Sequence, residues 1–304
     1  MKEHKNGAGN SAQDDGAKKK KPVTKYRKLR RLFARTPLRA PLVWLRHRDL
    51  NPADIFFAAY PKSGTTWARF VLFEMLSGKA SGFKATNQEM PGVGLHKNAI
   101  KLLPNGGRLV ATHEFYRKEY HKSIYMVRDA RDVMLSEYAF LNALDFYHED
   151  LPSFVPYFLF TCVSAYGPWH KNVASWLDSP IANTENMMLV RYEDLLEDTQ
   201  REMTRIAEFL GLNNSAEQIR RAVELSSADN MRKLETAQTN EWATTKESRK
   251  DIPFVRSAKS GQWRQSLPAA SVNEIESAWG PVMQLLGYPL SNQLPASKSL
   301  VQEI

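Results

Sequence analysis

The sequence predicts a single α/β domain in which helices flank a central parallel sheet. Four short apolar segments, at 55–60, 108–112, 124–127 and 187–192, have the composition of strands that are buried on both faces. Segments with helical spacing follow the first, third and fourth of these strands. Strands that alternate with helices in this way are typical of a parallel sheet with helices on both faces.

The first predicted strand leads into a short polar turn. Residues 61–66 read PKSGTT, and a helix is predicted over 67–76. Backbone N–H groups of such a turn, together with the helix N-terminus, form an anion site. Gly64 allows close backbone approach, and Lys62 adds a full charge. Because Lys62 precedes the glycine, the turn departs from the G-x-x-x-x-G-K-[ST] pattern of nucleoside triphosphatases.

Two more candidate residues stand at the ends of predicted strands. His113 follows the strand at 108–112, and Arg128 follows the strand at 124–127. Ligands of open parallel sheets bind outside the carboxyl ends of the strands, so both residues are expected near Lys62. A histidine there suits proton transfer, although a core or capping role is the alternative. An arginine suits a second phosphate, which it can hold with two hydrogen bonds. In the helix expected at 129–141, Arg131 and Asp132 are predicted to form surface or capping pairs.

Helices account for most of the remaining domain. They are predicted in 154–177, with a break at Gly167-Pro168, and over 193–210, 215–225 and 271–286. The segment 77–103 is rich in glycine and proline, and the acceptor pocket is expected to be built from the irregular segments near 78–104, 142–160 and 239–255. The polar segment 239–252 is expected to be a mobile loop.

Positive charge is concentrated before the domain. Met1–Arg48 holds 15 Lys and Arg against 3 Asp and Glu, a net of +12, while the whole chain carries +9. The body is therefore slightly acidic, and no nucleic-acid partner is expected. The sequence predicts a disordered basic leader over 1–24, a basic amphipathic arm over 25–48, the domain over 49–290 and a tail over 291–304. The arm includes a short predicted helix from Tyr26 to Phe33. It would bind an anionic membrane surface or an acidic polymer, or serve only as a solvated leader helix.

The composition limits the protein class further. The single cysteine, Cys162, excludes an intrachain disulfide, favours a reducing compartment and is expected to be a small buried hydrophobe. The polar N-terminus has no signal-peptide pattern, and no apolar run reaches the ~18 residues of a membrane span. The expected location is cytoplasmic, with peripheral membrane contact as the alternative that the arm leaves open. No Cys/His spacing typical of a metal site occurs.

Six separate stretches resemble the sulfotransferase family that uses 3′-phosphoadenosine 5′-phosphosulfate (PAPS). They occur in the family's order, at YPKSGTTW (60–67), ATH (111–113), VRDARDVMLSEY (127–138), YGPWHKNVASW (166–176), VRYEDLLEDTQREMTRIAEFLG (190–211) and RSAKSGQW (256–263). The resemblance implies a P-loop-like parallel sheet. It also implies transfer of a sulfuryl group from PAPS to an acceptor hydroxyl on a sugar, a lipid or another alcohol.

The resemblance also implies roles for individual residues. The donor's 5′-phosphosulfate would be held by Lys62, Ser63, Gly64, Thr65 and Thr66. The adenine would contact Trp67, Tyr192 and Ser226, and the 3′-phosphate would be held by Arg128, Ser136 and Arg256. His113 matches the general base and would accept the acceptor's proton, although Glu114 beside it is an alternative. In principle no divalent metal is needed, since loop, lysine and arginine neutralise the donor.

The chain departs from the family pattern in four places. Ala111 replaces a lysine, Ala228 replaces an expected aromatic residue, and Arg256-Ser257-Ala258 lacks the lysine and glycine of an R-K-G element. The C-terminal dimer pattern K-x-x-x-T-V-x-x-x-E is missing. Small phenols and steroids are therefore not favoured as acceptors. Two other classes remain as alternatives, a nucleotide kinase or nucleoside triphosphatase, and a nucleotide-binding protein without catalysis.

Overall fold

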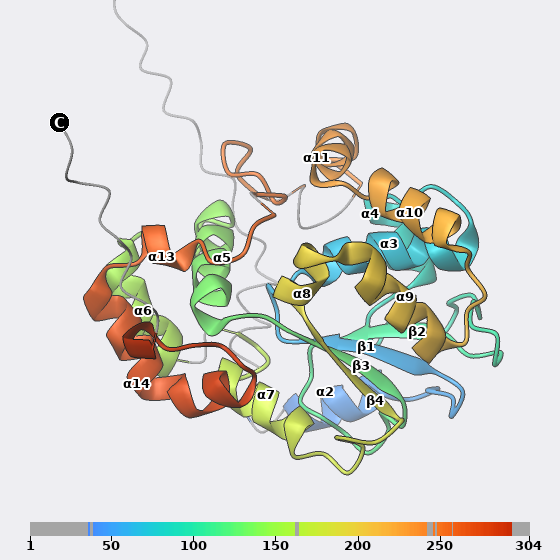
Figure 1. The fold of residues 1–304 in the computed structure, drawn as a ribbon, viewed down its shortest axis with the longest axis horizontal. Helices are drawn as coiled ribbons and strands as arrows, with labels where there is room; N and C mark the ends of the chain where they lie inside the picture. The colour runs from blue at the N-terminus through green and yellow to red at the C-terminus, as the bar shows by residue number, and fades with distance from the viewer. Residues whose placement is uncertain are drawn as a thin grey trace, which may run out of the picture.

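A four-stranded parallel sheet forms the centre of the computed structural model, which describes residues 36, 39–161, 164–241, 246, 248–256 and 258–293. The strands are β1 (Ile55–Ala59), β2 (Leu109–Thr112), β3 (Ser123–Val127) and β4 (Met187–Arg191), in the order β2-β1-β3-β4. All neighbouring pairs are parallel (Figure 1). The predicted α/β class and all four predicted strands are confirmed.

The register brings the strand ends together. Ala58 pairs with Thr112, Ala59 with Met126, and Val127 with Arg191. Since the strands are parallel, the residues that follow them leave the sheet at one edge. The loop that begins at Pro61, together with His113 and Arg128, therefore begins in one layer.

Helices cover both faces of the sheet. The main ones are α2 (Arg39–Arg46), α3 (Thr65–Ser77), α4 (Phe83–Glu89), α5 (Ala130–Ala143), α6 (Leu151–Phe160), α7 (Trp169–Leu177), α8 (Tyr192–Glu197), α9 (Thr199–Leu210), α10 (Ala216–Leu225), α11 (Ala228–Ala237), α13 (Trp263–Ser266) and α14 (Ala269–Leu285). A 3₁₀ turn, η1 (Ser291–Gln293), follows. In Figure 1, α3, α8, α9 and α10 lie on one side of the sheet and α7 on the other.

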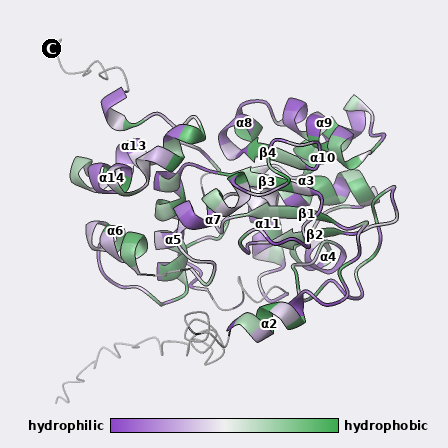
Figure 2. Cartoon of the chain, turned by 90° about the horizontal axis from the view of Figure 1, so that it is seen from below, coloured by the Kyte–Doolittle hydropathy of each residue, from purple (hydrophilic) through white to green (hydrophobic). Residues whose placement is uncertain are grey.

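Alternate side chains of β1 point to opposite faces of the sheet and belong to two separate hydrophobic clusters. Phe56 and Ala58 pack with the group that includes α6, α7 and α14, while Ile55 and Phe57 pack with α3, α9 and α10. All four side chains are buried, as the unbroken apolar run predicts for a central parallel strand. Figure 2 colours the chain by hydropathy and shows green residues in the strands of the sheet.

The predicted helices differ from the structure in several places. Neither α2 nor α13 was predicted, and the first helix predicted in 154–177 begins at Leu151 and ends at Phe160. The segment 77–103 contains α4, and α11 follows α10 although no helix was predicted there. The helix predicted over 193–210 is two helices, because Asp198 interrupts it and caps α9 by accepting from the Arg201 N–H. Helices α4 and α11 contain few apolar residues, so their sequences show no clear helical spacing of apolar positions.

Arg131 and Asp132 are not surface residues, contrary to the prediction. Arg131 is fully buried, pairs with Asp129 and Glu276 at 2.6 and 2.5 Å, and lies over the Trp263 ring. Asp132 is also buried and accepts hydrogen bonds from the backbone N–H groups of Gly261 and Trp263. Asp129 is the N-cap of the same helix, but Glu276, Gly261 and Trp263 lie more than 100 residues away in the sequence, so the local pattern could not indicate them.

Several predictions concern residues outside the described part of the chain. They are the leader, the predicted helix at Tyr26–Phe33, Cys162 and the tail after Pro295. The predicted loop at 239–252 is described only in part. No helix among the described residues is both long and apolar enough to cross a bilayer. The described residues also include no group of three His, Cys, Asp or Glu arranged for a metal ion.

Candidate active site

The loop between β1 and α3 has the backbone geometry of an anion site. Lys62 and Gly64 both have positive φ, 70° and 93°, and Gly64 is the N-cap of α3. A Cβ at Gly64 would lie 2.5 Å from the Tyr192 ring, so only glycine fits here without displacing that ring. The first turn of α3 contains no acidic residue, and its N–H groups face the loop. An anion is therefore favoured at this helix end.

Three predicted donor ligands are buried with polar atoms unsatisfied. Ser63 Oγ, Arg128 Nε and Ser226 Oγ are among the buried side-chain atoms of the described residues that have no hydrogen-bond partner. Ser63 and Ser226 are fully buried, and Arg128 is 7% exposed. Leaving such groups unpaired costs about 1–3 kcal/mol each. They fit a ligand with many acceptor oxygens, as PAPS has.

Arg128 joins the loop to two other elements. Its guanidinium donates to the backbone carbonyls of Lys62 at 3.2 Å and Lys259 at 3.1 Å, and lies over the Tyr192 ring at 4.5 Å. Asp132 contacts it at 3.8 Å. This arginine is therefore held on the anion loop, next to a ring that also contacts Gly64.

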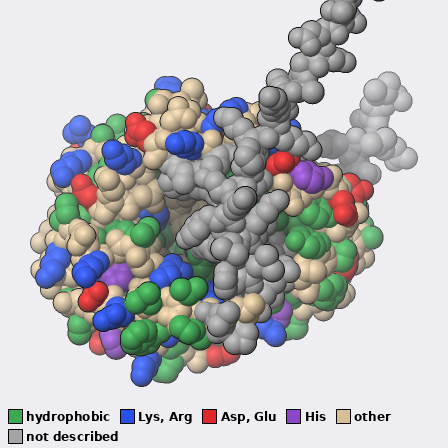
Figure 3. All heavy atoms as spheres, turned by 180° about the vertical axis from the view of Figure 1, so that it is seen from behind, with side chains coloured by type: hydrophobic (Ala, Val, Ile, Leu, Met, Phe, Trp, Pro, Cys, Tyr) green, Lys and Arg blue, Asp and Glu red, His purple; other side chains and the backbone are tan. Residues whose placement is uncertain are grey.

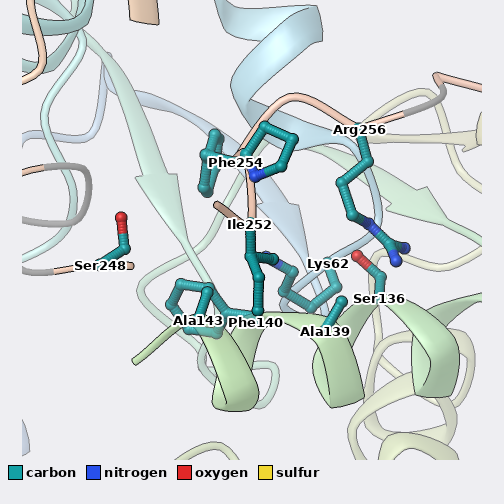
Figure 4. Close-up of a pocket in the computed structure, with 10 residues that line it drawn as sticks. Lys62, Ser136, Ala139, Phe140, Ala143, Ser248, Ile252, Phe254 and Arg256 are labelled. Carbon is teal, nitrogen blue, oxygen red and sulfur yellow. The ribbon is translucent and has the colours of Figure 1, made fainter. Parts of the chain in front are cut away.

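Lys62 lies in a pocket between α5 and the segment 252–256. Ser136 and Phe140 of α5 and Phe254 and Arg256 of that segment line the pocket with it (Figure 4). The Lys62 ammonium lies 4.0 Å from the centroid of Phe140 and 5.0 Å from that of Phe254. The pocket is therefore lined by three predicted donor ligands, Lys62, Ser136 and Arg256, and by the apolar rings of Phe140 and Phe254.

Three cations, Lys62, Arg128 and Arg256, influence one another in the site. Burial of the Lys62 ammonium lowers its pKa to about 8; Glu137 opposes this shift, while Arg256 and Arg128 add to it. The pKa of Arg256 is also lowered, first by burial and then by the charge of Arg128. Since these cations repel one another, a bound polyanion relieves the repulsion.

His113 directly follows β2. Its Nδ1 donates to the backbone carbonyl of Ala59 at 2.7 Å, which places the lone pair of the neutral ring on Nε2. Ala59 ends β1, three residues before Lys62. The ring also packs edge-on against Tyr166, with centroids 5.4 Å apart. These contacts fix the imidazole at the edge of the anion loop.

Glu114 occupies a different environment from His113. It is buried, and its carboxylate pairs with Arg39 at 2.5 Å and with Arg46 at 3.3 Å. Its two oxygens are therefore occupied by cations from α2. This pairing favours His113 over Glu114 for proton transfer.

Trp67 and Tyr192 lie together, with ring centroids 6.1 Å apart in an edge-on arrangement. Tyr192 in turn links them to Gly64 and Arg128. Thr65 and Thr66 form the first turn of α3. Ser226 caps the C-terminus of α10, and no described contact joins it to the other predicted residues.

Sequence reasoning missed Phe140, Phe254 and Tyr166 as parts of the site. Phe140 lies one helical turn after Ser136 on α5, a spacing that could have indicated it. Tyr166 begins one of the stretches that resemble the family, and Phe254 lies in a segment expected to build the acceptor pocket, but the local sequence singles out neither residue.

The comparisons with known proteins identify the family. Residues 52–287 match the model of the sulfotransferase domain, so the chain belongs to the sulfotransferase family. Mouse sulfotransferase 1E1 is 30% identical over 245 residues, which cover 72% of this chain and 80% of that protein. Cytosolic sulfotransferase 1 of the zebrafish, Danio rerio, is 26% identical over 260 residues, 79% of this chain and 86% of the relative.

Solved structures share the fold. Retinol dehydratase in complex with retinol and PAP matches with a TM-score of 0.64 and 20% identity, covering 79% of this chain and 84% of that one. Mouse sulfotransferase SULT7A1 complexed with PAP matches with a TM-score of 0.63 and 20% identity, covering 79% and 87%. The protein is a PAPS-dependent sulfotransferase, as the motifs predict, and the kinase alternative is not supported.

Proposed function

We propose that this chain transfers the sulfuryl group of PAPS in line to an acceptor hydroxyl, with His113 as general base. The observation that carries the proposal is the His113–Ala59 hydrogen bond, which holds the imidazole beside the anion loop. The S–O bond to the donor phosphate breaks as the acceptor oxygen bonds to sulfur. The hydroxyl proton moves to His113 Nε2, and adenosine 3′,5′-bisphosphate leaves with the electron pair.

Two groups of residues would stabilise the leaving nucleotide. Lys62 and the N–H groups of the loop would face the 5′-phosphosulfate, where negative charge develops. Arg128, Ser136 and Arg256 would bind the 3′-phosphate. The edge-on pair Trp67 and Tyr192 would hold the adenine, with Ser226 as a further adenine contact.

For the acceptor, we propose only the group that reacts, a hydroxyl. A hydroxyl on a sugar, a lipid or another alcohol fits proton transfer to a histidine. The apolar wall of Phe140 and Phe254 supports an acceptor with an apolar part next to that hydroxyl. A transfer screen with labelled PAPS against sugar, lipid, phenol and amine acceptors tests this: labelled sulfate esters of alcohols support it, and labelling of amines alone would overturn it.

Arg128→Ala is expected to weaken PAPS binding by roughly tenfold to a hundredfold. A charged hydrogen bond contributes about 1.5–3 kcal/mol, and Arg128 would supply it to the 3′-phosphate. Adenosine 5′-phosphosulfate lacks that phosphate, so its affinity should hardly change. Calorimetry with both nucleotides measures the difference. The control is Arg205→Ala, an exposed arginine of α9 paired with Glu202. Equal losses for both nucleotides would remove Arg128 from the 3′ site.

We also propose that the basic residues 1–48 tether the enzyme to an anionic surface, either lipid of the cytoplasmic leaflet or a polyanionic acceptor. The net charge of +12 supports this. Each basic residue near an anionic bilayer contributes about 1 kcal/mol, an attraction that falls off over a Debye length of ~8 Å. The name of the zebrafish relative supports a cytoplasmic location.

Deleting residues 1–35 is expected to reduce cosedimentation with anionic liposomes, and raised salt should remove the part of the binding that depends on charge. The deletion stops at 35 because α2 packs on the body through Glu114. Donor affinity should not change, since the predicted donor ligands all follow Tyr60. Two results together would contradict the tether and leave the arm as a solvated leader. The intact protein would not bind anionic liposomes at low salt, and the deletion would not change its activity on polymer acceptors.

A further inference from the structure

The helix α2 exposes most of its large apolar side chains, unlike an ordinary surface helix. Its inward side carries one buried apolar residue, Val43, and two cations, Arg39 and Arg46, which pair with buried Glu114. Its outward side carries Leu42, Trp44 and Leu45, which are 50%, 63% and 53% exposed. A surface helix normally presents polar residues to water and apolar residues to the core.

A neighbouring loop extends this exposed apolar surface. Arg46 donates to the backbone carbonyl of Val93 at 2.6 Å, and the His96 ring bonds the carbonyl of Arg48 at 3.1 Å. Leu95, between these two anchor points, is 79% exposed. We call Leu42, Trp44, Leu45 and Leu95 the α2 patch. Figure 2 places α2 at the edge of the molecule, and Figure 3 shows hydrophobic side chains gathered among Lys and Arg on the face seen from behind.

Cations belong to the same two segments as the α2 patch. Arg48, Lys97 and Lys101 are all exposed. The Arg48 guanidinium lies 5.5 Å from the centroid of the Trp44 ring, so a cation and an aromatic ring meet on one surface. Apolar side chains with tryptophan, accompanied by arginine and lysine, are typical of surfaces that enter the headgroup region of a bilayer. The +12 charge of residues 1–48 favours an anionic bilayer as the partner of this surface.

We infer that the α2 patch inserts into the interface of an anionic lipid bilayer. The inference rests on the tether proposed above, chooses lipid over polymer, and adds an apolar contact to its electrostatic attraction. Arg39 lies 5.9 Å from the Tyr166 ring, which packs on His113, and it also pairs with Glu114. Docking through α2 therefore fixes the orientation of β2, and of His113 after it, relative to the membrane.

The test compares vesicles of phosphatidylcholine alone with vesicles that also contain phosphatidylglycerol. The variant Leu42→Ser/Trp44→Ser/Leu45→Ser should lower partitioning into the anionic vesicles by about tenfold or more, because it removes apolar area from the interface. The control, Leu285→Ser, removes a leucine of α14 that is 72% exposed, and it should bind as the wild type does. Calorimetry with adenosine 3′,5′-bisphosphate should give equal affinities for all three proteins and so verify their folds.

Salt separates this inference from the electrostatic tether. Binding that persists at high salt should disappear in the triple variant, whereas deletion of residues 1–35 should remove mainly the salt-sensitive part. A triple variant that partitions as the wild type does, while the deletion does not, would overturn the inference and leave the tether. Failure of the intact protein to bind either kind of vesicle would overturn both. Donor affinity and sulfuryl transfer are measured without vesicles, so they test the proposed enzyme activity independently of membrane binding.

Discussion

His113→Ala is expected to lower turnover by about a hundredfold or more while donor affinity stays nearly unchanged. General base catalysis typically contributes ~10²–10⁴ in rate, and the imidazole is held at the edge of the anion loop by the carbonyl of Ala59. Donor binding does not depend on this ring, because the anion loop and Arg128 supply the cations. Turnover at saturating acceptor, measured beside calorimetry with adenosine 3′,5′-bisphosphate, separates the two effects.

Two variants control this prediction. His121→Ala removes an exposed histidine from the opposite end of β3 and should leave turnover unchanged. Glu114→Gln tests the alternative base and should cost less than His113→Ala, because the carboxylate pairs with Arg39 and Arg46. Near-normal turnover in His113→Ala, with a large loss in Glu114→Gln, would move the base assignment to Glu114.

Lys62→Ala is expected to damage both donor affinity and turnover. The ammonium would face the 5′-phosphosulfate in the ground state, and the charge on the leaving phosphate grows in the transition state. Each effect should exceed tenfold, since a hydrogen bond to a charged group contributes about 1.5–3 kcal/mol. Lys79→Ala removes an exposed lysine beyond α3 as the matched control. Loss of turnover without loss of donor affinity would mean that Lys62 stabilises only the transition state and not the bound donor.

The lowered pKa of Lys62, about 8, adds a pH dependence to this prediction. Below pH 8 the ammonium is charged and attracts the donor; as the pH rises through 8 the free enzyme loses that proton, and donor affinity falls. Between pH 7 and 9 the affinity should drop by about tenfold at most, as for one titrating group. Lys62→Arg keeps its charge over this range and should flatten the profile. A wild-type profile that is equally flat would contradict the role of this group.

The strands were predictable because a parallel sheet buries both faces, which leaves continuous apolar runs in the sequence. The alignment of Lys62, His113 and Arg128 at one edge followed from the parallel direction of β1, β2 and β3. The helices α4 and α11 were missed because they are short and largely polar. Short polar segments form helices when the surrounding structure stabilises them, and their own pattern does not show it.

The surroundings of the site were less predictable than its first residues. The partners of Glu114 lie 68 and 75 residues earlier in the chain, and Phe254 faces Lys62 from a remote segment. Such contacts depend on how the helices pack, which no local spacing encodes. The assignment of Ser226 comes only from the family resemblance, and its unpaired hydroxyl is consistent with a ligand contact.

The central claim is that PAPS is consumed as a sulfuryl donor at the site built around Lys62 and His113. The most direct measurement follows adenosine 3′,5′-bisphosphate and sulfated product together, with and without EDTA, for the wild type and His113→Ala. We expect equal amounts of both products from the wild type, no effect of EDTA, and about a hundredfold slower release from the variant. Donor binding without turnover, or turnover that requires a divalent metal and yields a phosphorylated acceptor, would contradict it.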